Sequence, residues 1–160
     1  MTNFDLMAKD WDCVPRRIER ARAVAEAIKT GIHLSPSTKA FEYGCGTGLL
    51  SFALQPHLGH ITLADSSPGM LSVLEGKIRS SGIRNMTPLK LDLSMDSLPQ
   101  ERYDLIYTLM TLHHIPDTES VERFLHSLGE QRLFVHRRPG QRRRFISWSW
   151  IRGSQGFRPG

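Results

Sequence analysis

The sequence contains no apolar run long enough to cross a membrane and only two cysteines among its 160 residues. A transmembrane helix needs about 20 predominantly apolar residues. The first ten residues, MTNFDLMAKD, lack the basic and then apolar order of a secretory signal. Cys13 and Cys45 are too few for a disulfide framework, so we expect reduced thiols. These absences favour a cytoplasmic protein with one domain.

Acidic residues are absent after Glu130. Residues 1–130 carry 13 basic and 16 acidic side chains, whereas residues 131–160 carry eight basic ones. The formal charge of +5 therefore comes from the C-terminal stretch, and it does not indicate a nucleic-acid surface on the preceding domain. Glu19 and Glu26 interrupt an arginine cluster, so we expect a solvated helix face there, consisting of Arg16, Arg17, Arg20 and Arg22.

Three alternating glycines follow a short apolar stretch. Gly44, Gly46 and Gly48 stand between residues 40–43 and an apolar run at helical spacing, which predicts a strand, a glycine loop and a helix. Glycine permits positive φ and lets a ligand approach the backbone. The following helix N-terminus favours an anionic group. A dinucleotide fingerprint would need glycine at position 49, where Leu49 stands.

The rest of the chain alternates strand-like and helix-like segments. This order predicts an α/β domain with a mostly parallel sheet of about five strands and helices on both faces. Asp12 is expected to cap the first helix, while Ser67 and Pro68 begin the third. Helices are predicted over residues 11–30, 49–55, 67–79 and 118–128, and strands over residues 40–43, 61–64, up to 92, 105–109 and 132–135.

Acidic residues stand at the ends of three consecutive expected strands. They are Glu42, Asp65 and Asp92. In a doubly wound sheet these ends share the edge where ligands bind, and a carboxylate about 20 residues after the glycine loop accepts hydrogen bonds from ribose hydroxyls. Asp65 has that position. As alternatives, Asp65 is a turn or cap residue and Asp92 an ordinary loop aspartate.

The pattern E-x-G-x-G-x-G that begins at Glu42 resembles motif I of class I S-adenosylmethionine-dependent methyltransferases. The stretch LHHIPD, residues 112–117, is similar to the small-molecule branch that includes quinone-biosynthesis methyltransferases. The resemblance covers about residues 36–136. It implies a Rossmann-like doubly wound fold and methyl transfer to a small-molecule acceptor. Two alternatives stay open: an impaired remnant that still binds the cofactor, and a nicotinamide-dependent oxidoreductase.

This resemblance implies a role for each acidic strand end. Glu42 and the glycine loop would hold the methionine part of the cofactor, Asp65 the ribose and Asp92 the adenine amino group. Met70 would flank the adenine or belong to the core. Trp11 would cover the cofactor or anchor the core. The residues assigned to S-adenosylmethionine are Glu42, Gly44, Cys45, Gly46, Thr47, Gly48, Asp65, Ser66, Met70, Asp92, Leu93 and Thr108.

His113 and His114 are weak candidates for a base on the substrate side. They lack cysteines or acidic residues at the spacing of a metal site, so we expect no metal there. Packing is the alternative role for both. A base is required only if the acceptor must lose its proton early, and catalytic residues are otherwise unknown.

The composition and patterning of the sequence change from His136 onward. It has no acidic residue and no periodicity, and arginines are interleaved with Phe145, Trp148 and Trp150. Family members usually add a helix and an antiparallel hairpin here, which about 25 residues cannot supply. A nucleic-acid arm, a disordered tail and a reading frame lost near residues 129–136 are the alternatives. We predict an incomplete methyltransferase domain over residues 1–136, an irregular tail over residues 137–160, and self-association through an unpaired sheet edge.

Overall fold

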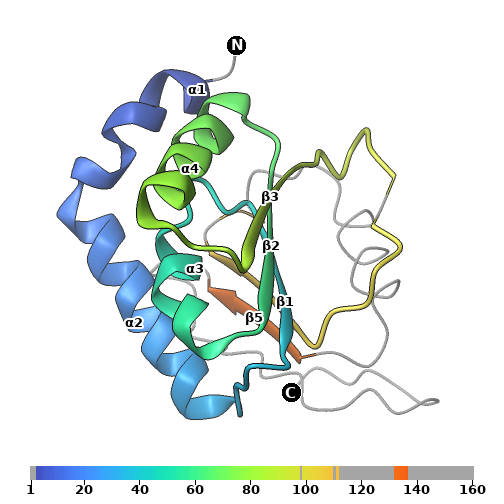
Figure 1. Ribbon diagram of the computed structural model, residues 1–160. Helices are drawn as coiled ribbons and strands as arrows, with labels where there is room; N and C mark the ends of the chain where they lie inside the picture. Colours follow the sequence, from blue (N-terminus) through green and yellow to red (C-terminus); the bar gives the residue numbers. More distant parts are fainter. Residues whose placement is uncertain (1–2, 98, 110, 112–131, 137–160) are drawn as a thin grey trace, which may run out of the picture.

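The fold is built around one parallel β-sheet (Figure 1). The computed structural model describes residues 3–97, 99–109, 111 and 132–136. The strands are β1 (Lys39–Tyr43), β2 (His60–Asp65), β3 (Met86–Lys90), β4 (Leu105–Leu109) and β5 (Arg132–His136). The helices are α1 (Asn3–Met7), η1 (Ala8–Cys13), α2 (Pro15–Gly31), α3 (Leu49–Leu54), η2 (Gln55–His57) and α4 (Pro68–Ser81).

The strand order β3-β2-β1-β4-β5 confirms the predicted α/β class. All neighbouring strands are parallel, and each predicted strand agrees with an observed one within two residues. From β1 in the middle, the chain fills one side with β2 and β3 before it fills the other with β4 and β5. Such a reversal opens a crevice at the carboxyl ends of the strands, next to β1.

Helices α2, α3 and α4 lie on one face of the sheet (Figure 1). Alternate strand residues, such as Leu63 and Tyr107, pack into the core that these helices share. On the opposite face, the rings of Phe41 and Tyr103 pack with their centroids 5.0 Å apart. No described helix has the length and apolarity of a membrane span. The helix predicted over residues 118–128 and the tail over residues 137–160 lie outside the described residues.

Helix α4 begins and ends where its sequence signals predict. The Ser67 hydroxyl accepts a hydrogen bond from the Met70 amide at 3.2 Å, and Pro68 occupies the first turn. Gly82 follows the helix with a φ of +67°, a conformation that favours glycine. These local contacts fix where the polypeptide leaves β2 and enters the helix.

The predicted cap of the first helix is wrong. Helix α2 begins at Pro15 and has no side-chain cap. The Asp12 carboxylate instead accepts a hydrogen bond from the Thr47 hydroxyl at 2.5 Å and pairs with the Lys77 ammonium at 2.7 Å. Proline at the first turn needs no amide partner, so the helix start leaves Asp12 available for these long-range contacts.

Candidate ligand-binding site

A cavity of about 650 Å³ opens at the carboxyl ends of β1, β2 and β4. Its position is the crevice expected where the strand order reverses, and its volume is typical of small-molecule sites. The glycine loop after β1 forms part of the wall, and α1, η1 and α2 contribute the side opposite the sheet. The site therefore combines sheet residues with a segment from the start of the chain.

The three acidic strand ends meet in this cavity, as the sequence indicates. Glu42, Asp65 and Asp92 all line it. Parallel strands bring residues far apart in sequence to a common edge, which explains the convergence. The arrangement concentrates negative charge or protonatable carboxyl groups in one place, and it suits a ligand with hydroxyl groups and positive charge.

The glycine loop has the conformation that its residue types allow. Gly44, Gly46 and Gly48 have φ values of +68°, +54° and +82°. At Gly44 a Cβ atom would also lie only 2.1 Å from the Thr111 side chain. Positive φ costs other residues roughly 1–2 kcal/mol, so the three glycines let the backbone turn toward the cavity without strain.

Asp65 connects the glycine loop to the start of α4. Its Oδ2 accepts a hydrogen bond from the Gly46 amide at 2.8 Å, and its Oδ1 accepts one from the Ser67 amide at 2.9 Å. Burial raises the pKa of Asp65, while the bonds from Ser67 and Gly46 lower it. Asp65 thus has the turn role given as its alternative. Its side chain also lines the cavity, and each carboxylate oxygen can accept a further hydrogen bond.

Glu42 is buried in the cavity wall, with an exposed fraction of 2%. Its carboxyl group accepts a hydrogen bond from the Ser51 hydroxyl, which is itself 2.6 Å from the Tyr107 hydroxyl. Burial raises the pKa of Glu42 to about 8, and the charge of Asp65 adds to this rise. No ion pair forms at Glu42 among the residues that the structure describes. A buried carboxyl group without a counter-ion retains its proton at neutral pH.

Asp92 lies in a more solvated part of the site. Its Oδ1 accepts hydrogen bonds from the Ser94 hydroxyl at 2.6 Å and from the Ser94 amide at 3.0 Å. The Ser94 side chain, followed by its amide, lowers the pKa of Asp92. The cavity therefore has an ionised carboxylate at this margin and a protonatable one, Glu42, at its inner wall.

Most of the wall opposite the sheet is not predicted by the sequence. Four residues of the N-terminal segment line the cavity, and the sequence predicts a covering role for only one of them, Trp11. The four are Asn3, Phe4, Met7 and Trp11. Two aspartates attach this N-terminal segment, residues 3–13, to the rest of the protein. Asp12 bonds to Thr47 and Lys77, and Asp5 accepts hydrogen bonds from the Ser67 hydroxyl at 2.6 Å and the Gly69 amide at 2.9 Å.

The solvated face predicted for the arginines of α2 is wrong for two of them. Arg17 and Arg20 line the cavity, whereas Arg16 and Arg22 are exposed as expected. The Arg17 guanidinium lies 3.7 Å from the centroid of the Trp11 ring and donates to the Trp11 carbonyl at 3.0 Å. Arg17 is four residues before the buried Ala21, so helical spacing was a signal that these side chains border the core face.

Several predicted site residues lie elsewhere. Cys45, Ser66 and Met70 line the cavity, but four other predicted residues do not, namely Thr47, Gly48, Leu93 and Thr108. Leu93 packs on the opposite face of the sheet, and the buried Thr108 hydroxyl has no hydrogen-bond partner in the described part of the chain. Gly48 packs toward Leu74. The buried Thr47 bonds to Asp12.

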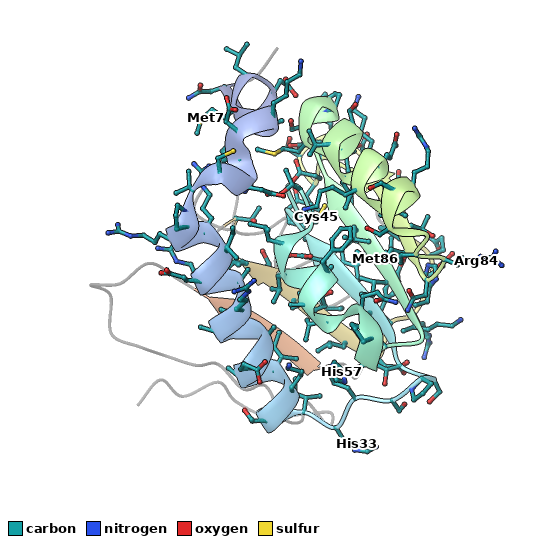
Figure 2. The ribbon with its side chains drawn as sticks, turned by 60° about the vertical axis from the view of Figure 1, so that its left-hand side comes forward. Met7, His33, Cys45, His57, Arg84 and Met86 are labelled. Carbon is teal, nitrogen blue, oxygen red and sulfur yellow. The ribbon has the colours of Figure 1, made fainter. Side chains whose placement is uncertain are left out.

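The candidate histidine base remains a prediction, because His113 and His114 lie outside the described residues. His33 and His57 lie at the lower end of the molecule in Figure 2, away from Cys45, and neither lines the cavity. Within the described ranges, no group of three or more potential ligands could hold a metal ion.

Comparison with known proteins identifies similar sequences and folds. Residues 40–130 match the family model described as a methyltransferase domain. The chain is 32% identical over 103 residues to an uncharacterized methyltransferase of Schizosaccharomyces pombe, covering 59% of this chain and 36% of that protein. It is 33% identical over 88 residues to the ubiquinone biosynthesis O-methyltransferase of Marinobacter nauticus, covering 53% of this chain and 37% of that protein. The chain thus spans little more than a third of these relatives.

A solved structure has the same fold. It is a putative S-adenosyl-L-methionine-dependent methyltransferase of Methanococcus maripaludis, with a TM-score of 0.73 and 18% identity. The match covers 84% of this chain and 64% of that one. At this identity the likeness supports the Rossmann-like architecture of the sheet and its helices.

Proposed function

Because the chain belongs to the methyltransferase-domain family, which it matches over more than half its length, we propose that it binds S-adenosylmethionine and transfers the methyl group to a small-molecule acceptor. One observation carries the proposal. Carboxyl groups from three consecutive strand ends and a glycine loop line the same cavity. The set fits a ligand that combines ribose hydroxyls, an amino group and a positively charged sulfur.

Each cavity residue is assigned to the part of S-adenosylmethionine that its side chain can bind. Asp65 would accept hydrogen bonds from the ribose hydroxyls, Asp92 from the adenine amino group, and Glu42 would face the methionine part. Arg17 and Arg20 lie on the α2 side of the same cavity, where a guanidinium complements a carboxylate. Trp11 offers an aromatic wall. These roles use only side chains that line the cavity.

The reaction makes modest demands on the protein. The cofactor supplies a methyl group that its sulfonium already activates. The chain contributes by orienting the reactants and excluding water, and well-oriented reactions reach effective molarities of about 10⁵–10⁸ M. The N-terminal segment and the glycine loop enclose the cavity from two sides, which suits this positioning role.

Asp65→Ala tests the proposal by calorimetry with S-adenosylmethionine. We expect the variant to lose about 1.5–3 kcal/mol of binding free energy, as for hydrogen bonds to a charged group. Asp104→Ala is the matched control, because the Asp104 carboxylate also accepts a backbone amide, that of Lys39 at 2.8 Å, but at the amino end of β1. Equal affinity in both variants would remove Asp65 from the site.

The same titrations separate the alternatives. A nicotinamide-dependent oxidoreductase would bind NAD(H) in place of S-adenosylmethionine, although Leu49 occupies the position of the third fingerprint glycine. A remnant would bind S-adenosylmethionine and release no S-adenosylhomocysteine with any small-molecule acceptor. Binding followed by product release supports the proposed methyl transfer.

A further inference from the structure

Glu42 differs from the other two acids because it ends a buried hydrogen-bonded chain. The Ser51 hydroxyl lies between the Glu42 carboxyl group and the Tyr107 hydroxyl. With the Ser51 hydrogen directed to Glu42, the Tyr107 hydroxyl donates to Ser51. All three side chains are at least 98% buried, and Glu42 alone of the three lines the cavity. The chain holds this carboxyl group in one place at the cavity wall.

Among the described residues, no positively charged side chain pairs with Glu42. Asp65 from β2 and Asp92 after β3 line the same cavity, as do Cys45 of the loop and Arg17 and Arg20 of α2. Burial holds the pKa of Glu42 at about 8, and neither arginine forms an ion pair with it. Hydrogen bonds from the side chain and backbone of Ser51 oppose this rise. A positive charge brought into the cavity would therefore favour loss of the proton.

We infer that a proton and a cationic ligand compete for Glu42, so that this side chain makes the site prefer the sulfonium cofactor to its neutral thioether product. The inference rests on the proposed function. When the methyl group is transferred, a lone pair of the acceptor atom forms the new bond to the methyl carbon, while the bond between sulfur and that carbon breaks and its electron pair stays on sulfur. The acceptor then carries the added positive charge or releases a proton to solvent. The ligand then has one positive charge fewer, and Glu42 takes up a proton from solvent. Exchange of product for fresh cofactor releases that proton again.

Calorimetry between pH 6.5 and 7.5 tests the competition directly. Affinity for S-adenosylmethionine should rise by up to about tenfold over this unit, the limit for one linked proton, and affinity for S-adenosylhomocysteine by less than about threefold. Glu42→Gln is the control. The amino and carboxyl groups of each ligand titrate in the same way with the variant as with the unmodified protein, so they contribute equally to both pH profiles. In this variant the preference for S-adenosylmethionine should no longer change with pH.

Ser51 and Tyr107 act as positioning residues through Glu42. Ser51→Ala removes a hydrogen bond that favours the carboxylate, so the pH midpoint for S-adenosylmethionine affinity should move upward. Tyr107→Phe should move it in the same direction by less, because Tyr107 acts through Ser51. Tyr103→Phe is the control, since it removes a tyrosine hydroxyl outside the cavity and should leave the midpoint unchanged. A loss of packing alone would not shift this midpoint.

Proton release by the unmodified protein completes the test without any variant. At pH 7, heats measured in buffers of different ionisation enthalpy should give close to one proton released per S-adenosylmethionine and fewer per S-adenosylhomocysteine. Equal proton release and equal pH slopes for both ligands would overturn the inference while leaving the proposed function intact. A folded protein that binds neither ligand would overturn both.

Discussion

The sheet side of the cavity and the N-terminal segment that faces it are held in different ways. Glu42 and its neighbours sit on strands whose inward side chains are fully buried, such as Leu63. The N-terminal segment contributes Phe4 and Trp11 to the cavity but exposes 67% of Leu6. Burial of a core side chain contributes several kcal/mol, whereas the segment buries one side chain, Ala8, and is otherwise attached by hydrogen bonds to two carboxylates, each worth about 1.5–3 kcal/mol. The site therefore has a rigid sheet side and a more easily displaced opposite wall.

The sharpest test of this difference compares two leucine truncations. Leu63→Ala should lower the free energy of unfolding by about 2–5 kcal/mol, because it leaves a cavity in the core beneath the site. Leu6→Ala should change it by less than about 0.5 kcal/mol, because that side chain is largely in solvent. Urea unfolding measures both. Similar losses in the two variants would show that the N-terminal segment belongs to the same rigid unit.

The buried acid on the sheet side should make stability depend on pH. Folding raises the pKa of Glu42 from 4.5 to about 8, so between these values the folded state binds more protons than the unfolded state. Stability should then fall as pH rises through this range, by at most about 5 kcal/mol in all. The raised pKa of Asp65 acts in the same direction. Unfolding of Glu42→Gln measured at pH 5 and pH 8 should show a smaller decline, and an equal decline contradicts the assignment.

Two glycines of α4 offer a matched pair for displacing the opposite wall. A Cβ atom at Gly69 would lie 2.8 Å from the Asp5 Cα, whereas one at Gly76 would meet nothing within 4 Å. Gly69→Ala should cost about 1–3 kcal/mol and speed trypsin cleavage at Lys9, because it pushes the N-terminal segment away. Gly76→Ala should stabilise α4 by about 0.5–1 kcal/mol. Unchanged cleavage in Gly69→Ala would show that Asp5 does not hold the segment.

The smallest effect is expected from the ion pair behind the glycine loop. Lys77→Met removes the partner of Asp12 and should cost about 0.2–1 kcal/mol, with the difference shrinking as salt is added. Lys29→Met removes the Glu26–Lys29 pair, which lies within α2, and serves as the control. If only Lys77→Met also weakens binding of S-adenosylmethionine, the pair helps to hold the N-terminal wall in place.

The elements that place the sheet side of the site were predictable because their signals are local. Leu105–Leu109 is a short run of apolar residues interrupted only by Thr108, and it forms β4 as predicted. Ser67 with Pro68 begins α4 as expected. The convergence of Glu42 and Asp65 followed from the parallel strand order alone. One general property of parallel sheets therefore sufficed to bring these distant acids together.

The opposite wall was not predictable, because it is held by contacts between residues far apart in the sequence. Asp12 contacts residues 35 and 65 positions away, and such contacts leave no periodic pattern, so a local helix cap was the natural expectation. Arg17 and Arg20 carry charges typical of a solvated face. Helical spacing places Arg17 beside the buried Ala21, but the cavity that both arginines line is formed by residues from distant parts of the chain. Thr47 donates a hydrogen bond to Asp12 of the N-terminal segment and does not itself line the cavity.

Asp65 limits how this site can change its ligand. Asp65 lines the cavity, and its two carboxylate oxygens hold the Gly46 and Ser67 amides, so one side chain determines both the shape of a turn and the start of a helix. A substitution that altered ligand choice at this position would at once reshape the turn beneath it. Mutational routes to a new cofactor are therefore expected to pass through the residues around Asp65 while this side chain stays in place.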